Sequence, residues 1–319
     1  MVERSIVIDI EGLTKHFYLG FWRKRVQVLN GVDLQVYQNE TFGLLGPNGA
    51  GKTTTLKALV GLVKPTGGNV RILGKSPWNP RIRQHIGYLP EQPYIYGYLT
   101  GHEYLQLCGR IFHLSARQLR PRIAELLELV KLSDRDARKQ IRTYSKGMLQ
   151  RLAFAQTLVN DPQLLLLDEP MSGLDPLGRY DVKELILTLK QQGKTILFNS
   201  HILSDVEAIC DRVGIMVNGK LVLTGPIQQL QRPMDNLYQL RVQRLDKLAL
   251  TNLKRLSLRC VSLGRGQTQA TFNNLDQALK AMSVIRQSGA ELIELSTHFQ
   301  DLEDLFVREV DKARKEDEA

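Results

Sequence analysis

The sequence predicts an α/β fold, with a helical segment inserted into it and a small α+β domain after it. Through most of the first 225 residues, short apolar runs typical of buried strands alternate with amphipathic helical stretches. Helical periodicity dominates between about residues 100 and 160, and strands alternate with helices again after residue 225. We therefore expect a larger domain over residues 1–225, with a helical subdomain at about 100–160, and a smaller domain over residues 226–319.

Apolar runs and periodicity place the individual elements. In the first domain, strands are predicted at residues 5–10, 31–36, 41–45, 69–73, 164–167, 195–199 and 213–217. Helices are predicted there at residues 53–62, 122–130 and 148–159. In the second domain, we expect strands at residues 237–242, 268–272 and 291–295 and helices at 246–256 and 275–287. A last helix from His298 would carry an apolar stripe of Phe299, Leu302, Leu305, Phe306 and Val310.

The composition is that of a globular protein with a full hydrophobic core. Of the 319 residues, 43% are hydrophobic and 24% are charged. Cys108, Cys210 and Cys260 lie far apart without metal-ligand spacing, so we expect reduced thiols, as in a cytoplasmic protein. The N-terminus lacks the features of a signal peptide, and no apolar run approaches the roughly 20 residues of a membrane-spanning helix.

Charge alone limits the partners only loosely. The formal net charge is +10, but the basic residues between Arg71 and Lys146 are scattered, and no basic patch with interleaved aromatic residues indicates nucleic acid. The segment from Tyr18 to Leu29 contains Phe21, Trp22 and the basic run 23–25. A solvated hairpin is favoured for it over a contact with lipid headgroups.

The stretch GPNGAGKTT, which begins at Gly46, describes a backbone cradle for nucleotide phosphates. It fits the pattern GxxxxGK[ST] between an expected strand and an expected helix. Glycines let successive N–H groups converge on anionic oxygens, Lys52 adds a positive charge, and the Thr53 hydroxyl can bind Mg²⁺. The expected nucleotide-binding residues of the loop are Gly46, Pro47, Asn48, Gly49, Ala50, Gly51, Lys52, Thr53 and Thr54.

The run LLLLDEP, residues 164–170, predicts a second part of the same site. An apolar run without alternation is typical of a central strand in a parallel sheet, and ligands gather at the carboxyl ends of such strands. Asp168 would therefore bind Mg²⁺, directly or through water. Glu169 would accept a proton from the attacking water.

A third motif, YSKGMLQR from Tyr144, precedes an amphipathic helix. Ser145 is a good N-cap residue, and Gly147 leaves N–H groups of the first turn open. A helix N-terminus of this kind can bind a second phosphate. Taken by itself, the octet favours a plain capped helix over a phosphate site.

These motifs, followed by SGLD (residues 172–175) and NSH (residues 199–201), resemble in their order the ATP-binding subunits of ABC transporters, over roughly residues 5–225. The resemblance implies a P-loop NTPase fold of the ABC type with an inserted helical subdomain. It also implies that Ser145 and Gly147 contact the γ-phosphate of ATP bound by the opposite subunit. Two copies would then form a head-to-tail dimer with two shared ATP sites.

The resemblance assigns further residues by position. Phe17 matches the aromatic residue that stacks on adenine, with Tyr18 as its competitor. Asp175 matches the aspartate that links the two sites across the dimer. His201 matches the histidine that touches the γ-phosphate and joins Glu169 in catalysis, although a lone histidine after a strand often only caps a helix.

Two positions depart from the common pattern of the family. The glutamine of its Q-loop falls on Glu91, with Gln92 one place later as the alternative. YSKGM stands where LSGGQ is most common, and it resembles the branch that serves ABC-2 type exporters. The domain after residue 225 resembles the C-terminal extension of export-type subunits, for which we expect a role in dimer packing and leave a regulatory role open.

The expected function is therefore that of an ATPase subunit, using ATP and Mg²⁺, at the cytoplasmic face of the membrane. It would pair with itself or a close homologue and energise a separate permease of the ABC-2 type, with export as the expected direction. One alternative is a soluble ABC-type ATPase that acts on nucleic acid or ribosomes, although the coiled coils and zinc modules of such proteins are not evident. The other is a regulatory module that binds ATP without hydrolysing it.

Overall fold

The computed structural model describes residues 5–20, 24–230, 233–264, 266–299 and 302–318. The expectations for Phe21, Trp22 and Arg23 lie outside these residues. The chain forms two compact units, Met1–Ile227 with Glu309–Ala319, and Gln228–Arg308. No helix within the described residues is long and apolar enough to cross a membrane.

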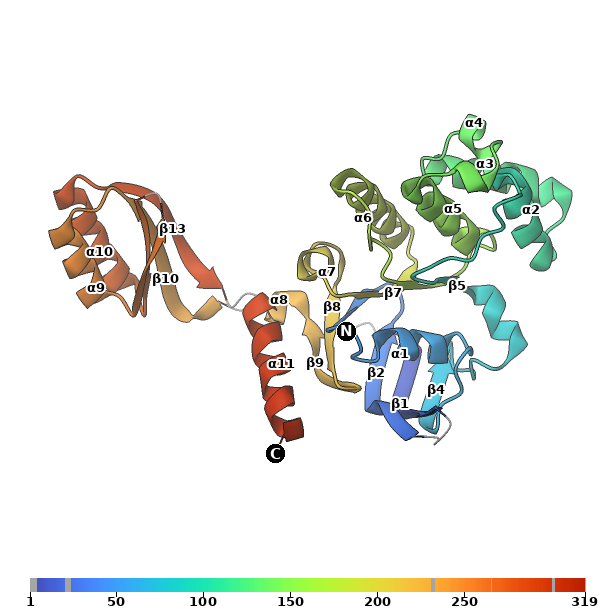
Figure 1. Ribbon diagram of the computed structural model, residues 1–319, viewed down its shortest axis with the longest axis horizontal. Coiled ribbons are helices and arrows are strands. Elements are labelled where there is room, and N and C mark those ends of the chain that lie inside the picture. Colours follow the sequence, from blue (N-terminus) through green and yellow to red (C-terminus); the bar gives the residue numbers. More distant parts are fainter. Residues whose placement is uncertain (1–4, 21–23, 231–232, 265, 300–301, 319) are drawn as a thin grey trace. The chain divides into compact units, whose positions relative to one another are not determined.

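A six-stranded sheet forms the centre of the first unit (Figure 1). Its first five strands are parallel and the last pairs antiparallel, in the order β5-β6-β7-β3-β8-β9. The strands are β3 (Thr41–Leu45), β5 (Ile86–Leu89), β6 (Leu164–Asp168), β7 (Thr195–Ser200), β8 (Arg212–Val217) and β9 (Lys220–Pro226). Every residue of β3, β6 and β7 is buried, which explains their uninterrupted apolar runs. Helices α1 (Lys52–Leu59), α6 (Pro176–Gln191), α7 (Leu203–Ile209) and the short α8 (Ile227–Leu230) belong to the same unit or its edge.

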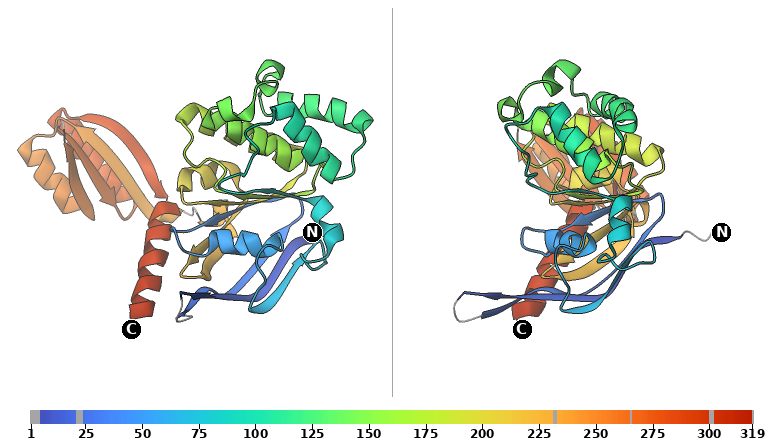
Figure 2. Two further views of the ribbon diagram at one scale, coloured as in Figure 1. Left: turned by 45° about the vertical axis from the view of Figure 1, so that its right-hand side comes forward. Right: turned by 90° about the vertical axis from the view of Figure 1, so that its right-hand side faces the viewer.

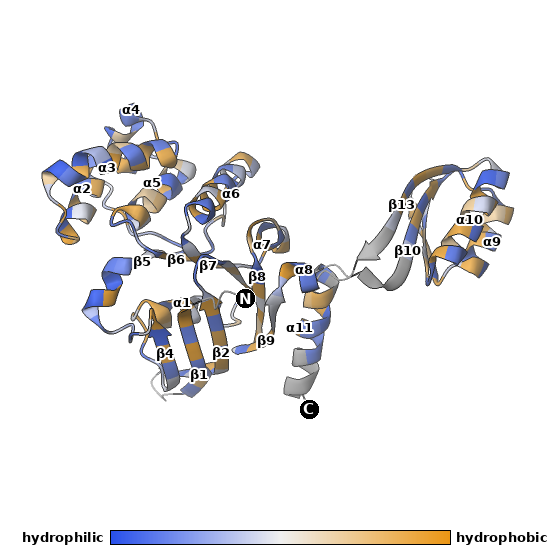
Figure 3. Ribbon diagram, turned by 180° about the vertical axis from the view of Figure 1, so that it is seen from behind, coloured by the Kyte–Doolittle hydropathy of each residue, from blue (hydrophilic) through white to orange (hydrophobic). Residues whose placement is uncertain are grey.

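A three-stranded antiparallel sheet, β2-β1-β4, packs beside the central sheet. It consists of β1 (Ile6–Leu19), β2 (Lys24–Tyr37) and β4 (Gly67–Ile72), whose bands alternate between hydrophobic and hydrophilic residues (Figure 3). The strands predicted at 5–10 and 31–36 are thus only the inner halves of two 14-residue strands. Their outer halves continue as a hairpin, paired as far as Leu19 and Lys24. Many residues of the outer halves are polar and exposed, so the apolar pattern did not predict the full length of the two strands.

Four helices form the subdomain that the periodicity predicts between residues 100 and 160 (Figure 2). They are α2 (Gly101–Ile111), α3 (Ala116–Leu129), α4 (Asp134–Ala137) and α5 (Lys146–Leu158), with short 3₁₀ turns at Pro80–His85 and Ile141–Thr143. Helix α3 begins six residues before the expected start at residue 122. The reason is a capping box, in which Ser115 and Gln118 satisfy backbone groups at the helix start, so the helix runs through Pro121.

The second unit has the order β10 (Pro233–Gln243), α9 (Lys247–Leu256), β11 (Arg259–Gly264), β12 (Gln267–Phe272), α10 (Leu275–Ser288) and β13 (Glu291–Phe299). Its antiparallel sheet is ordered β11-β12-β10-β13, which is the split βαβ arrangement of ferredoxin-like domains. Leu240, Phe272, Ala278 and Ile285 form the core between the sheet and the two helices. Strand β11 is mostly exposed and has no apolar alternation that would have predicted it.

The last helix, α11, spans Leu302–Glu318, and it buries Leu305 and Val310 as the predicted stripe requires. Phe299 does not belong to this helix, and the expectation was wrong there. Phe299 ends strand β13, where it pairs with Pro233 of β10, and its extended backbone cannot continue into a helical turn.

A buried ion pair joins the two sheets of the first unit. Glu40, which is 1% exposed, accepts hydrogen bonds from the backbone N–H of Tyr37 (2.7 Å) and from Arg212 (3.0 Å). The Arg212 guanidinium also donates to the carbonyl of Gln35 (3.1 Å) and lies 5.3 Å from the centre of the Phe42 ring. Burial raises the pKa of Glu40, and Arg212 opposes that shift. Arg212 therefore compensates a carboxylate that water does not reach.

We expect Arg212→Ala to lower the free energy of unfolding by about 3 kcal/mol, because it leaves the Glu40 carboxylate buried and unpaired. Since the pKa of Glu40 is raised in the folded state, the carboxyl takes up a proton as the pH falls, and the loss should shrink in acid. Urea denaturation followed by circular dichroism at neutral and acidic pH measures both effects. Arg138→Ala, which removes an ion pair from an exposed helix surface, should cost less than about 1 kcal/mol. Equal losses in the two variants would contradict the assignment.

Candidate active site

The phosphate loop lies between the end of β3 and the start of α1. Gly49 and Gly51 adopt φ angles of 83° and 104°, in the left-handed region that favours glycine. A Cβ on Gly51 would lie 2.7 Å from Leu29 Cδ2 and 3.0 Å from the carbonyl oxygen of Val28. Gly51 is also the N-cap of α1 and offers no side-chain cap. The first N–H groups of α1 are thus left for an anionic ligand.

A hollow of about 390 Å³ opens in front of this loop. It brings together residues from five separate parts of the chain. Among the predicted site residues it is lined by Asn48, Gly49, Ala50, Gly51, Lys52, Thr53, Thr54, Glu91, Glu169 and His201. Val28 and Ser172 line it as well. Of the two candidates for the Q-loop position, Glu91 lines the hollow and Gln92 does not.

Lys52 is the positive centre of the hollow. Its Nζ donates hydrogen bonds to the carbonyl oxygens of Gly46 (2.6 Å) and Pro47 (3.2 Å), so these two residues form the base of the loop. The same Nζ lies 3.7 Å from Glu169 Oε1. Burial lowers the pKa of Lys52, while the carboxylates of Glu169 and Asp168 oppose that shift. The Lys52 amine therefore lies beside the phosphate loop, within reach of an anionic ligand that displaces its present partners.

Glu169 bridges Lys52 and His201. Its second oxygen, Oε2, lies 2.8 Å from His201 Nδ1. Glu169 follows the last residue of β6 and has a φ of 49°, in the left-handed region that residues other than glycine seldom occupy. Such backbone strain concentrates at functional sites. The arrangement places a carboxylate and an imidazole together beside the phosphate loop.

Thr53 lines the hollow and contacts Asp168, which does not line it. Asp168 is 2% exposed, and its Oδ1 accepts hydrogen bonds from Thr53 Oγ1 (2.9 Å) and Asn199 Nδ2 (2.9 Å). Burial raises the pKa of Asp168, and these two donors oppose the shift. A hydroxyl and a carboxylate are oxygen ligands of the kind that Mg²⁺ prefers, with nucleotide phosphates and water completing its shell. The residues present therefore fit this ion, although no cluster of three or more His, Cys, Asp or Glu side chains in the described chain holds a metal alone.

The predicted second phosphate site lies apart from the first. Ser145, Gly147 and Asp175 line another hollow of about 480 Å³, together with Lys146 and Gly173. Ser145 caps α5 through Met148 N–H (3.3 Å), and Asp175 caps α6 through Gly178 N–H (2.9 Å). One chain therefore carries the two groups of predicted residues in two different hollows.

The two candidates for the adenine contact lie on the β1 hairpin. Neither Phe17 nor Tyr18 lines the hollow at the phosphate loop, which reaches this hairpin only at Val28. Phe17 is partly buried beneath the amine of Lys15, 4.8 Å from its ring centre, and Tyr18 is 55% exposed.

Sequence reasoning missed one polar contact at the site. Asn199 was part of the NSH motif without a role of its own, and the structure places its amide on Asp168. A polar residue near the end of a mostly apolar strand could have indicated a role for Asn199. Its partner Asp168 could be identified only once β6 and β7 were seen to be neighbours in the sheet.

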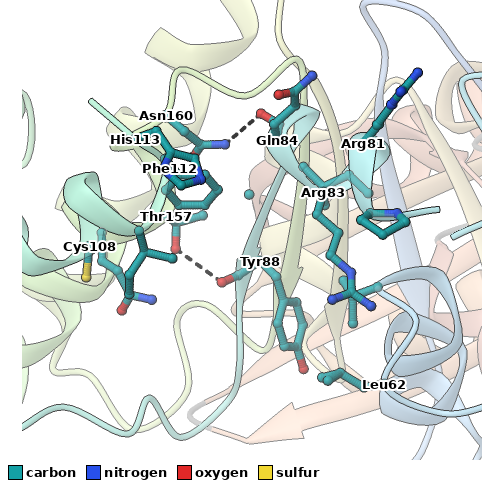
Figure 4. A pocket seen from close by; sticks show the side chains of 16 residues that line it. Leu62, Arg81, Arg83, Gln84, Tyr88, Cys108, Phe112, His113, Thr157 and Asn160 are labelled. Carbon is teal, nitrogen blue, oxygen red and sulfur yellow. Dashed lines mark hydrogen bonds between the residues drawn. The ribbon is translucent and has the colours of Figure 1, made fainter. Parts of the chain in front are cut away.

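A larger hollow, of about 780 Å³, lies between the end of α1, strand β5 and the helices α2 and α5 (Figure 4). Apolar side chains of Leu62, Ile86, Ile111 and Phe112 contribute to its lining. Arg81 and Arg83 of the turn before β5 add positive charge. Thr157 and Asn160 donate hydrogen bonds to backbone carbonyls.

Fold and site together define a P-loop nucleoside triphosphatase, with a glycine cradle at a strand-to-helix junction and an acidic pair beside it. The chain belongs to the ATP-binding proteins of ABC transporters. The sequence profile of the ABC transporter family matches residues 29–172. An uncharacterized ABC transporter ATP-binding protein of Nostoc sp. is 47% identical over 308 residues, which cover 96% of this chain and 90% of the relative.

Other comparisons agree with this assignment. The bacitracin transport ATP-binding protein BcrA of Bacillus licheniformis is 33% identical, with 95% of this chain and 97% of the relative covered. An ATP-binding cassette solved as a dimer in a post-hydrolysis state with ADP and Pi superimposes with a TM-score of 0.64 at 27% identity, covering 69% of this chain and 99% of that one. The predicted fold class, family and ATPase activity are confirmed, and the chain is the ATP-hydrolysing subunit of an ABC transporter.

We expect Gly51→Ala to abolish measurable ATP binding, because the new Cβ would press on Leu29 and the Val28 carbonyl while the backbone is held at an unfavourable φ. Gly74→Ala is the matched control, since Gly74 also has a positive φ of 71° but has free space around it. This control should lose only about 1 kcal/mol of stability and bind ATP as the wild type does. Calorimetric titration with ATP decides between them, and normal binding by Gly51→Ala would contradict the role of this glycine.

Proposed function

We propose that this subunit hydrolyses Mg-ATP in the hollow at the phosphate loop and thereby energises export through a separate permease of the ABC-2 type, at the cytoplasmic face of the membrane. The observation that carries the proposal is the meeting of Lys52, Glu169 and His201 in front of the loop, with Thr53 and Asp168 behind them. Export is supported by the names of relatives, among them a fluoroquinolones export ATP-binding protein of Mycobacterium tuberculosis that is 40% identical over 218 residues.

Each group at the site has a distinct task in this proposal. The backbone N–H groups of residues 48–54 and the Lys52 amine bind the phosphates, and Gly46 and Pro47 form the start of the loop. Thr53 and Asp168 hold Mg²⁺, which supplies positive charge to the phosphate oxygens when bound. Glu169 orients the attacking water and takes its proton, a contribution of about 10² to 10⁴ in rate for a placed general base. His201 holds Glu169 through the 2.8 Å contact and reaches the γ-phosphate.

Two further residues of this subunit belong to the proposed ATP site. Glu91 lines the hollow, and its charge acts on both Lys52 and Asp168. Phe17 contacts adenine, with Tyr18 as the alternative beside it. Both lie on the hairpin that reaches the hollow at Val28.

A second subunit completes the site in this proposal. Ser145 and Gly147 at the start of α5, and Asp175 at the start of α6, line a hollow of their own and have no phosphate loop beside them. A head-to-tail dimer would bring these residues of one subunit to the phosphate loop of the other. The dimeric cassette bound to ADP and Pi supports such an assembly.

The permease is proposed to contact the large hollow in Figure 4. It offers apolar lining for a helical segment, and Arg81 and Arg83 give it a positive rim. The expected occupant is therefore a short permease helix with an acidic residue. For the second unit we propose a role in dimer packing, because Leu292, Ile293 and Leu295 are exposed on its edge strand β13.

We expect Glu169→Gln to reduce ATP hydrolysis by at least about 10²-fold, because the amide cannot take up the proton. ATP binding should persist, and Mg-ATP should trap the variant as a dimer in size-exclusion chromatography. Lys52→Ala is the contrasting variant and should lose both binding and dimer formation. Wild-type turnover in Glu169→Gln would show that Glu169 is not the general base. If the wild-type chain neither bound nor hydrolysed Mg-ATP, the proposed function itself would be contradicted.

We expect Ile111→Arg to prevent co-purification of the subunit with its permease, because it places a charge in the apolar lining of the large hollow. ATP binding by the isolated subunit should be unchanged, since the phosphate loop lies in a separate hollow. Leu248→Arg, at an equally exposed leucine of α9, is the control and should retain the permease. If Ile111→Arg still co-purified with the permease, the large hollow would not be the site of permease contact.

A further inference from the structure

One polar side chain lies in the most deeply buried part of the central sheet. Asn199 is the second to last residue of β7, every residue of which is buried, and it is 0% exposed. Its neighbours across the sheet are Leu44 of β3 and Asp168 of β6. An amide in such a place loses the hydrogen bonds that water would give it, whereas an apolar side chain would lose none. Its presence needs an explanation.

Half of the explanation is the contact with Asp168. Asn199 Nδ2 donates to Asp168 Oδ1 at 2.9 Å, and Thr53 Oγ1 donates to the same oxygen at 2.9 Å. The buried carboxylate of Asp168 is thus oriented by two donors from two different elements. The opposite orientation of the amide would set its oxygen against the carboxylate oxygen, so the contact itself fixes which atom is the donor.

The other half of the amide has no partner. Asn199 Oδ1 is buried and accepts no hydrogen bond from any residue that the structure describes. A buried acceptor without a donor costs free energy, and native proteins retain few of them. If the only task of the side chain were to donate to Asp168, a hydroxyl could perform it without leaving a carbonyl oxygen unpaired. The unpaired oxygen therefore points to a donor that arrives with the ligand.

We propose that Asn199 is a positioning residue for the cation-binding pair Thr53 and Asp168, and that its Oδ1 accepts a hydrogen bond from a water molecule that accompanies the cation. This inference rests on the proposed function of the site. The amide keeps the Asp168 carboxylate in place when the Thr53 hydroxyl is used as a ligand, because the bond from Nδ2 does not depend on Thr53. Residues that hold metal ligands in this way commonly set the affinity for the metal.

The test is the Mg²⁺ dependence of the thermal stabilisation that ATP gives to the full chain. Asn199→Leu replaces the amide by an apolar side chain of similar size, and Asn199→Ala serves as the second variant if leucine prevents folding. In either variant the Mg²⁺ concentration for half of the effect should rise by about 10- to 100-fold, the usual result of removing a partner of a metal ligand. Stabilisation by ATP in excess EDTA should stay close to that of the wild type, because the phosphate loop is untouched.

Phe198→Leu is the matched control. Phe198 precedes Asn199 in β7 and is equally buried, but its side chain lies on the opposite face of the sheet. This variant should lose stability without a change in its Mg²⁺ response. An unchanged Mg²⁺ requirement in Asn199→Leu and Asn199→Ala would overturn the inference and leave the proposed function intact. A wild-type chain without any Mg²⁺ response would contradict the proposed function, and the inference with it.

Discussion

The pairing of three parallel strands is the constraint on which the site depends. Leu44 of β3, Asn199 of β7 and Asp168 of β6 lie side by side across the sheet. The loops that follow these strands consequently leave the sheet at one edge, and they carry the phosphate loop, Glu169 and His201. The contacts between Thr53 and Asp168 and between Glu169 and His201 both cross from one strand end to another. A shift in the register of any of these strands would break at least one of these two contacts.

The same edge also brings opposite charges into a space with little water. Lys52 faces Glu169, while Asp168 is shielded by Thr53 and Asn199. Burial disfavours both charged forms, since it lowers the pKa of Lys52 and raises that of Asp168. Without a nucleotide, the charge of Lys52 is thus compensated by Glu169, and the carboxylate of Asp168 by hydrogen bonds from Thr53 and Asn199. A triphosphate can engage Lys52 only by competing with the loop carbonyls and Glu169, so affinity for the nucleotide includes the loss of these contacts.

The sequence predicted the central strands β3 and β6, which are buried on both faces, but not the four-residue strand β5 at the edge of the same sheet. The runs at 41–45 and 164–167 have one interpretation because every residue in them is apolar or buried, and the phosphate loop has a spacing that few other structures share. A hairpin was expected between Tyr18 and Leu29, and β1 and β2 do pair there, but the two strands were predicted too short because many of their outer residues are polar and exposed. Phe299 was assigned to a helix because an apolar residue three places before Leu302 fits a helical stripe and an extended strand equally well.

The individual side-chain contacts of the site could not be predicted from the sequence, because they depend on which strands are neighbours in the sheet. The bond from Asn199 to Asp168 depends on β6 and β7 being neighbours, which local patterns do not specify. The left-handed backbone of Glu169 depends on how the chain leaves β6, and no residue type at that position signals it. Motifs located the chemistry, but the distances between side chains follow from the order of strands in the sheet.

The two units of the chain are not simply consecutive in the sequence. The first unit includes both Met1–Ile227 and Glu309–Ala319, so the second unit, Gln228–Arg308, is enclosed by it in the sequence. In the sequence it is flanked on both sides by residues of the first unit. A single cut in the chain on either side of it would leave it covalently attached through the other side. Shortening the protein at residue 225 would therefore remove Glu309–Ala319 of the first unit along with the second unit.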